Sequence, residues 1–316
     1  MRSEDFNKAF ETYSKIKKNI LTVFKGDPFN IDLLLSGYFT NGHILLEDYP
    51  GTGKTTLAKA LALSIQTDFK RIQFTPDLLP TDITGVNVFN VKDQNFYLQK
   101  GPVFTNILLA DEINRTTSRT QSALLEAMEE KQVTIDGTIY PLSDDFFVVS
   151  TLNPAELQGT YPLPESQIDR FALRFSLGYL SKKEEVEMLE MKNPSKPLAE
   201  LSSCSTRDEI LQVRAVLDEI TVHDDIKDFI VELVRRTRSY DGILIGASPR
   251  ASIALQKLSK VLALSENKQF VTPDHVIKLA PFVLGHRLIF DQFVNDEETK
   301  QIDIIDNIIK ETPVPK

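Results

Sequence analysis

Leu45-Leu46-Glu47-Asp48-Tyr49-Pro50-Gly51-Thr52-Gly53-Lys54-Thr55-Thr56 is a run in which an apolar segment, a loop with two glycines and a Lys-Thr pair follow one another. The largely apolar residues 43–46 predict a buried strand, and the spacing of Leu57, Leu61 and Ile65 predicts a helix that starts at Thr55. A strand, a glycine loop and a helix in this order form a cradle for phosphate, because the glycines let backbone N–H groups approach an anion. The helix N-terminus adds partial positive charge. The run therefore predicts a nucleotide-binding loop.

Within this loop, Lys54 would reach the β- and γ-phosphates, and the Thr55 hydroxyl would hold a Mg²⁺ ion. Asp48 departs from the pattern, because such loops usually open with glycine. A carboxylate beside a triphosphate is unexpected unless it points away or caps the turn. The alternative is a chance Gly-x-Gly-Lys-Thr in a surface turn, against which the flanking strand and helix argue. The residues expected to contact nucleotide are Asp48, Tyr49, Pro50, Gly51, Thr52, Gly53, Lys54, Thr55 and Thr56.

Two apolar residues upstream, Val23 and Phe24, are candidates for the nucleotide-base site. The segment before a phosphate loop often lies over the base, so that these side chains could supply an apolar wall. The alternative interpretation, that both are ordinary core residues, stays open at this point.

A second motif carries two carboxylates at the end of a strand. Residues 107–110 are apolar and predict a fully buried strand, and Asp111 and Glu112 follow it directly. In open α/β sheets ligands bind at the carboxyl ends of the strands. Asp111 would contact the Mg²⁺ shell, and Glu112 would orient and polarise the attacking water. Apolar runs that end in Asp-Glu are common, but the position of this one, 57 residues after Lys54, strengthens the interpretation.

A third strand end, after residues 146–151, carries Asn153. Its amide could hydrogen-bond the γ-phosphate or the attacking water. Asn153 precedes Pro154, and an Asn-Pro pair that starts a turn is an equally simple explanation.

The order of the predicted elements gives the domain organisation. Hairpins are expected at 86–98 and at 133–140, the second with an Asp-Gly turn. A capping box at Ser118-x-x-Gln121 predicts a helix to about residue 130, and from residue 181 the pattern is purely helical. We therefore expect an α/β nucleotide-binding core over 1–192, a linker over 193–205, and an all-helical domain over 206–316.

Composition limits the class of protein. The chain has 316 residues and a net charge of −9, which argues against a protein that mainly binds nucleic-acid backbones. Cys204 is the single cysteine and the four histidines are scattered, so that no disulfide framework or zinc site is expected. No apolar run approaches the ~20 residues of a membrane span, and no signal-type apolar segment follows the N-terminus. These features predict a cytoplasmic globular protein without membrane insertion.

With these residues in view, the chain resembles the MoxR family of AAA+ ATPases over nearly its whole length. The resemblance implies a P-loop core with a parallel sheet and hairpin insertions, followed by a small helical lid. It also implies Mg²⁺-dependent ATP hydrolysis, a homo-oligomer that is a hexameric ring, and chaperone-like action on proteins, often ones with von Willebrand A-type domains. The segments that carry it are 42–47, 82–85, 111–115, 121–130, 151–154, 169–171 and 246–251.

The resemblance also implies roles for individual residues. Asn153 would be the first sensor, and Arg170 would be an arginine finger acting on a neighbour's nucleotide. Arg250 would be the second sensor, reaching from the lid to the γ-phosphate. The simpler alternatives are an ion pair of Arg170 with Asp169 and an Arg250 that extends into solvent.

Two other functions remain open from the sequence. One is a DNA-acting AAA+ motor, which salt-dependent, DNA-stimulated hydrolysis would reveal. The other is a nucleotide-gated binding module with little turnover, which a steady-state phosphate-release assay would distinguish.

Overall fold

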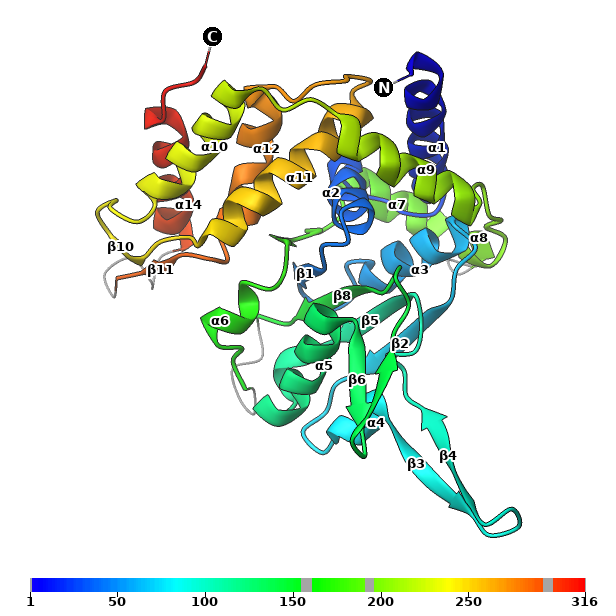
Figure 1. Ribbon diagram of the computed structural model, residues 1–316. Helices are drawn as coiled ribbons and strands as arrows, with labels where there is room; N and C mark the ends of the chain where they lie inside the picture. Colours follow the sequence, from blue (N-terminus) through cyan, green and yellow to red (C-terminus); the bar gives the residue numbers. More distant parts are fainter. Residues whose placement is uncertain (1, 155–160, 191–195, 292–297, 316) are drawn as a thin grey trace.

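A five-stranded parallel sheet lies at the centre of the computed structural model, which describes residues 2–154, 161–190, 196–291 and 298–315 (Figure 1). Neighbouring strands are joined in parallel throughout. The strands predicted at 43–46, 107–110 and 146–151 are confirmed. The spatial order of the five strands is β2 (Phe69–Gln73), β5 (Ile107–Asp111), β8 (Phe147–Leu152), β1 (Ile44–Glu47) and β9 (Leu173–Phe175).

Both faces of the sheet are covered, as a parallel sheet requires. Successive residues of a strand point to opposite faces, so that Ile44 and Leu46 pack with one core cluster while Leu45 packs with another. Helices of the first face are α1 (Ser3–Leu21), α2 (Pro28–Phe39) and α3 (Lys54–Ser64). The second face is covered by α5 (Ser118–Glu130), and the short helices α4 (Pro80–Thr84), α6 (Glu165–Ile168) and the 3-10 turn Ile113–Arg115 lie around it.

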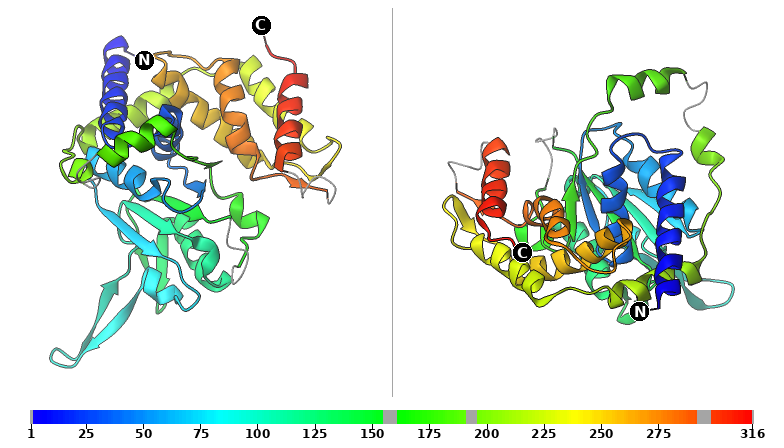
Figure 2. Two further views of the ribbon diagram at one scale, coloured as in Figure 1. Left: turned by 180° about the vertical axis from the view of Figure 1, so that it is seen from behind. Right: turned by 90° about the horizontal axis from the view of Figure 1, so that it is seen from above.

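Two antiparallel hairpins interrupt the core, as predicted. The first, β3 (Gly85–Asn90) with β4 (Asn95–Lys100), projects from the body in both Figure 1 and the reversed view of Figure 2. The second pairs β6 (Gln132–Ile135) with β7 (Thr138–Pro141). Asp136 and Gly137 both have positive φ, the geometry that a two-residue hairpin turn requires. The two hairpins touch, since Asn87 Nδ2 donates to Asp136 Oδ2 at 2.9 Å.

The second half of the chain is mainly helical. Its elements are α7 (Lys182–Glu190), α8 (Lys196–Ala199), α9 (Arg207–Glu219), α10 (Asp224–Arg236), α11 (Pro249–Ser265), α12 (Pro273–Leu284) and α14 (Glu298–Glu311). A small sheet of β10 (Ile243–Ile245) and β11 (Ile289–Phe290) was not predicted, and neither was α14. Residues 193–195 of the expected linker lie outside the described residues. Along the rest of the described chain, no helix combines the length and the apolar character that crossing a bilayer demands.

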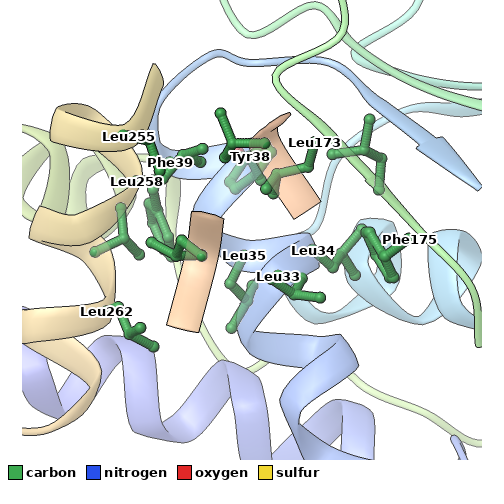
Figure 3. Close-up of a cluster of buried hydrophobic side chains, with 14 of the residues drawn as sticks. Leu33, Leu34, Leu35, Tyr38, Phe39, Leu173, Phe175, Leu255, Leu258 and Leu262 are labelled. Carbon is green, nitrogen blue, oxygen red and sulfur yellow. The ribbon is translucent and has the colours of Figure 1, made fainter. Parts of the chain in front are cut away.

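The helical part and the sheet share one apolar core. Leu255, Leu258 and Leu262 of α11 face the leucines of α2, whose other side approaches Leu173 and Phe175 of β9 (Figure 3). All five of these residues belong to a single cluster that also includes α1 and α3 residues. Helix α2 therefore connects the sheet to the helical part by direct packing.

Two helices of the second half begin with a capping box, and the one capping box predicted above is absent. Thr206 and Glu209 form a capping box at the start of α9, and Ser181 and Glu184 do the same for α7. The capping box predicted at Ser118-x-x-Gln121 is wrong. The N-cap of α5 is Thr117, and Gln121 is fully buried, because its amide bonds backbone carbonyls inside the protein.

Candidate active site

The predicted phosphate loop joins the end of β1 to the start of α3. Gly51 and Gly53 have φ of 88° and 93°, in the left-handed region that favours glycine, and Gly53 is the N-cap of α3. The Lys54 Nζ group donates to the carbonyl oxygens of Asp48 and Tyr49, at 2.8 and 2.9 Å. A cavity of about 350 Å³ opens over the loop. It is lined by Pro50, Gly51, Gly53, Lys54, Thr55, Thr56, Arg71, Gln73, Asp111 and Glu112.

The cavity thus combines the two predicted motifs. Lys54 and the first turn of α3 provide positive charge on one side, and Asp111 and Glu112 provide carboxylates on the other. Burial lowers the pKa of Lys54, and the carboxylates of Asp48, Asp111 and Glu112 oppose that shift. The net effect is a lowered pKa, because the burial of Lys54 outweighs the attraction of the nearby carboxylates for its charged form.

Asp111 is held in place by two neighbours. Its Oδ1 atom accepts from the Thr151 hydroxyl at 2.6 Å, and its Oδ2 atom accepts from Arg71 Nη2 at 2.6 Å and Nε at 3.1 Å. Thr151 lies on β8 and Arg71 on β2, the two strands that flank β5. The carboxylate is 8% exposed and faces the loop cavity. A hydroxyl and a carboxylate, from Thr55 and Asp111, are the hard oxygen donors that Mg²⁺ prefers.

Glu112 has an unusual backbone. Its φ is 58°, in a left-handed region that is uncommon for a residue with a side chain. Its N–H donates to the Thr151 hydroxyl at 2.8 Å. Its Oε2 atom accepts from Gln73 Nε2 at 2.7 Å and lies 3.0 Å from Arg115 Nη1. Because three different neighbours fix this residue, the carboxylate is positioned by the scaffold and not by a free loop.

Several site residues were not predicted from the sequence. Arg71 and Gln73 lie on the edge strand β2, where Gln73 is in register with Asp111. Alternating polar side chains on an edge strand are ordinary, so they gave no signal for a site. Gln121 is the third, and its amide donates to the carbonyls of Ile113, Thr116 and Tyr161 at 3.1, 3.2 and 2.9 Å. It thereby holds the turn that follows Glu112.

Arg170 and Arg250 meet at a different place. Both approach Glu129 near the end of α5: Arg170 Nη1 lies 3.0 Å from Oε2, and Arg250 Nη2 lies 2.8 Å from Oε1. Arg250 comes from the first turn of α11, which begins at the N-cap Ser248. The three residues line a second cavity of about 280 Å³. Among the described residues around the phosphate-loop cavity, neither arginine is present.

The ion pair of Arg170 with Asp169, given above as the simpler alternative, is not what the structure contains. Arg170 pairs with Glu129, while Asp169 Oδ1 accepts from the buried Arg287 Nε at 2.8 Å. Asp169 Oδ2 accepts from the Ser248 hydroxyl at 3.1 Å. Asp169 therefore joins the core to the start of α11, and the neighbouring arginine is directed elsewhere.

Comparison with known proteins agrees with this geometry. The model of the ATPase family associated with various cellular activities (AAA) matches residues 43–173, and the model of the AAA lid domain matches residues 235–308. Chaperone MoxR1 of Mycobacterium tuberculosis is 37% identical over 295 residues, which cover 90% of this chain and 78% of that protein. The chain belongs to the MoxR family of AAA+ ATPases.

Two further relatives extend the comparison. The protein YeaC of Bacillus subtilis, described as uncharacterized, is 46% identical over 283 residues, covering 90% of this chain and 88% of that protein. A solved structure from Cytophaga hutchinsonii, with a provisional ATPase assignment, is 38% identical. It superposes with a TM-score of 0.90 and covers 99% of this chain and 98% of that one. The AAA+ fold predicted from the sequence is therefore confirmed.

In this MoxR-family chain, Asn153 follows β8 between the two halves of the site. Strand β8 lies between β5, which ends at Asp111, and β1, which leads into the phosphate loop. Asn153 is 4% exposed. It stands at the carboxyl edge of the sheet, where the ligands of open α/β folds bind, and the residues described around the loop cavity do not include it.

The structure settles where the Asp48 side chain lies. It is 2% exposed, and its oxygens accept from the Ser176 hydroxyl at 2.8 Å and from the N–H groups of Leu177 and Gly178 at 2.5 and 3.2 Å. The carboxylate therefore points away from the phosphate loop and bonds the segment after β9, which favours the first of the two possibilities, and it does not cap the turn of its own loop. The loop cavity is lined by other residues of the loop, so that the Asp48 carboxylate does not itself face the space over the loop.

The upstream residues Val23 and Phe24 belong to the core that supports the loop. Phe24 is 3% exposed, and its ring lies 3.7 Å from the position that a Cβ atom on Gly53 would occupy. Val23 is partly buried against the same cluster. This placement favours the core interpretation for Phe24, which packs directly beneath the last glycine of the loop.

Proposed function

We propose that this chain is a Mg²⁺-dependent ATPase that couples ATP hydrolysis to chaperone-like remodelling or maturation of partner proteins. The observation that carries the proposal is the single cavity in which Lys54 and Thr55 face Asp111 and Glu112. The proposal is further supported by membership in an ATPase family. A positively charged phosphate cradle that faces two carboxylates suits phosphoryl transfer, in which catalysis consists mainly of positioning and charge stabilisation.

The phosphates of ATP are bound by the loop and by Lys54. For this, the lysine must exchange the carbonyls of Asp48 and Tyr49 for phosphate oxygens. Thr55 and Asp111 would hold Mg²⁺, which supplies charge neutralisation at the phosphates when bound. Asp111 currently pairs with Arg71, so that the guanidinium must move aside or share the carboxylate.

Glu112 orients the attacking water and accepts its proton. In the structure this carboxylate is held by Gln73 and Arg115. Gln73 and Arg115 both contact the Oε2 atom, so that this oxygen becomes available to a water molecule when those donors turn away. Asn153, at the adjacent strand end, would contact the γ-phosphate or the same water.

The arginines of each catalytic site come from a neighbouring subunit in the proposed ring. Arg170 and Arg250 lie beside each other on Glu129, at a site separate from the phosphate loop of their own chain. An arginine supplied in trans can raise the rate of phosphoryl transfer by ~10³–10⁵-fold. We propose that both arginines contact the nucleotide of the next subunit, in a hexameric ring. This differs from the sequence expectation that Arg250 reaches a γ-phosphate from its own lid.

The partner class is proposed from the relatives and from the surface. The Mycobacterium tuberculosis relative is named a chaperone, which favours protein substrates, and proteins with von Willebrand A-type domains are the candidates we would test first. The net charge of −9 disfavours nucleic acid as a substrate. The β3–β4 hairpin exposes apolar side chains, among them Phe89 and Phe96, whose rings lie 5.1 Å apart.

The hydrolytic proposal is tested by steady-state phosphate release with Mg²⁺ and ATP. Glu112→Gln should bind a fluorescent ATP analogue as the parent does and release phosphate at least ~10²-fold more slowly, because an amide cannot accept the proton. Glu130→Gln, a charge-matched change at an exposed residue of α5, is the control. Parent-like phosphate release from Glu112→Gln would show that the Asp-Glu pair is structural.

Action in trans is tested by mixing two inactive variants. Arg170→Ala keeps the phosphate loop and Lys54→Ala keeps the arginine, so that a mixed assembly contains intact composite sites. Phosphate release should reappear on mixing. If light scattering shows mixed assemblies and the mixture stays as inactive as its parts, Arg170 does not act on a neighbour.

A further inference from the structure

Asp48 stands where the phosphate loop meets another segment of the chain, residues 176–181, which we name the strap. The strap leads from β9 to α7. We propose that Asp48 is a positioning residue that fastens the phosphate loop to the strap, so that nucleotide binding at the loop is transmitted to α7. The inference depends on the nucleotide binding proposed above.

The buried Asp48 carboxylate attaches the loop to the strap by accepting three hydrogen bonds. Ser176 donates its hydroxyl, and Leu177 and Gly178 donate consecutive backbone N–H groups. Two successive amides that converge on one anion form a nest, which requires a left-handed residue, and Gly178 has φ of 71°. A glycine at position 48 would offer these donors no acceptor. The carboxylate is therefore matched to the strap.

A second contact lies next to the first. The ring of Tyr49 stacks on the ring of Tyr179, with centroids 5.8 Å apart and planes 12° from parallel. Both consecutive loop residues, 48 and 49, thus hold consecutive parts of the strap. Both rings are largely exposed, so the stack adds orientation more than burial.

The far end of the strap is also attached. Ser181 caps α7 through Glu184, whose Oε1 atom accepts from the Gly26 N–H at 3.0 Å. Gly26 lies two residues after Phe24, whose ring packs beneath Gly53 of the loop. The strap is therefore attached at Asp48, where the phosphate loop starts. Beyond the strap, Glu184 in the first turn of α7 is attached to Gly26, in the turn beside Phe24.

Lys54 links nucleotide binding to the contacts between the phosphate loop and the strap. Its Nζ group bonds the main-chain oxygens of Asp48 and Tyr49, the same two residues whose side chains hold the strap. A phosphate that draws Lys54 away removes a hydrogen bond from both residues at once. The loop backbone then relaxes, and the side chains of residues 48 and 49 carry that change to the strap.

Hydrogen exchange measured by mass spectrometry on peptides spanning 174–185 tests the inference. We expect Mg²⁺ with a slowly hydrolysed ATP analogue to change exchange at Leu177 and Gly178 in the parent. In Asp48→Asn, an amide group replaces one acceptor, and exchange without nucleotide should be about 5–30-fold faster, the factor for losing one or two hydrogen bonds. The response to nucleotide should disappear, while affinity for a fluorescent analogue stays within about threefold of the parent, since no phosphate contact is lost.

Controls separate the inference from general loss of structure. Glu47→Gln removes the same charge one residue earlier, from a carboxylate that pairs with Arg174, and should keep the nucleotide response. Ser176→Ala removes one donor and should weaken the response without disturbing the fold. If Asp48→Asn fails to fold, the Ser176→Ala result decides.

The outcomes distinguish this inference from the proposed function. A parent that binds nucleotide while exchange in the strap stays constant overturns the inference alone. An Asp48→Asn protein, or a Ser176→Ala protein where the first does not fold, with a full parent-like response overturns it as well. A parent that binds no nucleotide overturns both.

Discussion

Glu129 pairs with Arg170 of the core and with Arg250 of the helical part, which makes Glu129→Gln an informative change. Its two carboxylate oxygens hold one arginine each: Oε2 pairs with Arg170 and Oε1 with Arg250. If these arginines act on a neighbour's phosphate, they must first leave this carboxylate. The amide of glutamine keeps the size of the side chain and removes its charge. The variant should therefore release the arginines and raise ATP turnover in the assembled protein.

The structure sets the size of the effect. The side chains of Glu129, Arg170 and Arg250 are 35%, 31% and 53% exposed, so that water and salt screen both pairs. Partly exposed pairs contribute ~0.2–1 kcal/mol each, or about 0.4–2 kcal/mol for the two. Since 1.4 kcal/mol is a factor of ten, turnover should rise by about 2–30-fold. The free energy of unfolding should fall by no more than the same ~0.4–2 kcal/mol.

Phosphate release at several protein concentrations measures the turnover, and urea denaturation measures the stability. Glu130→Gln is the matched control, because it removes the same charge from the next residue. The difference between Glu129→Gln and the parent should shrink as salt is raised, since screening weakens the parent's pairs. A variant that turns over more slowly than the parent would refute this reasoning and show that Glu129 preorganises the arginines.

Three further predictions follow from the described contacts. Gln73→Ala removes a hydrogen bond from the Glu112 carboxylate and should raise ATP turnover by at most ~10-fold at unchanged nucleotide affinity; equal turnover in a phosphate-release assay would show that this contact exerts no control. Gln121→Met leaves three carbonyls without their donor and should lower the free energy of unfolding by ~1–3 kcal/mol in urea, whereas a loss under ~0.5 would contradict the geometry. Burial lowers the pKa of His43 to about 4, so that protonation favours the unfolded chain and stability should fall as pH drops from ~6.5 toward 4. Stability that stays constant over that range in urea titrations would show that His43 accepts a proton in the folded state.

Local patterns identified the parts of the fold that depend on neighbours in the sequence. The strand, loop and helix around Lys54 were predicted because an apolar run, a pair of glycines and helical periodicity all occur within about twenty residues. The 133–140 hairpin was predicted because Asp136 and Gly137 tolerate positive φ. The strands β10 and β11 were missed, because strands of three and two residues are specified only by pairing across more than forty residues. Helix α14 did carry a signal, in the spacing of Ile305, Ile308 and Ile309.

The residues of the candidate site also fall into those that a local pattern predicts and those that only tertiary structure reveals. Asp111 and Glu112 were found because an apolar strand that ends in two acids is a recognisable unit. Gln121 was misassigned, because Ser-x-x-Gln is a capping pattern in isolation and only tertiary burial shows that the amide points inward. Arg71 and Gln73 were missed, since their importance depends on the register of β2 beside β5. No local feature shows that one strand will lie beside another.

For Arg250, the sequence predicts the kind of partner but does not identify the residue. A cation in the first turn of a helix is electrostatically unfavourable, so the sequence alone indicates an anion beside it. The structure identifies that anion as Glu129, which is shared with Arg170. The two arginines thus converge on one acidic oxygen pair, the arrangement that a phosphate would also satisfy, while Lys54 lies at a different cavity. Among the described residues of one chain, the phosphate cradle and the arginine pair therefore line two separate cavities. Because the arginines lie apart from the cradle of their own chain, a second copy of the chain is the simplest complement, and the hydrolytic unit we propose is the contact between two subunits.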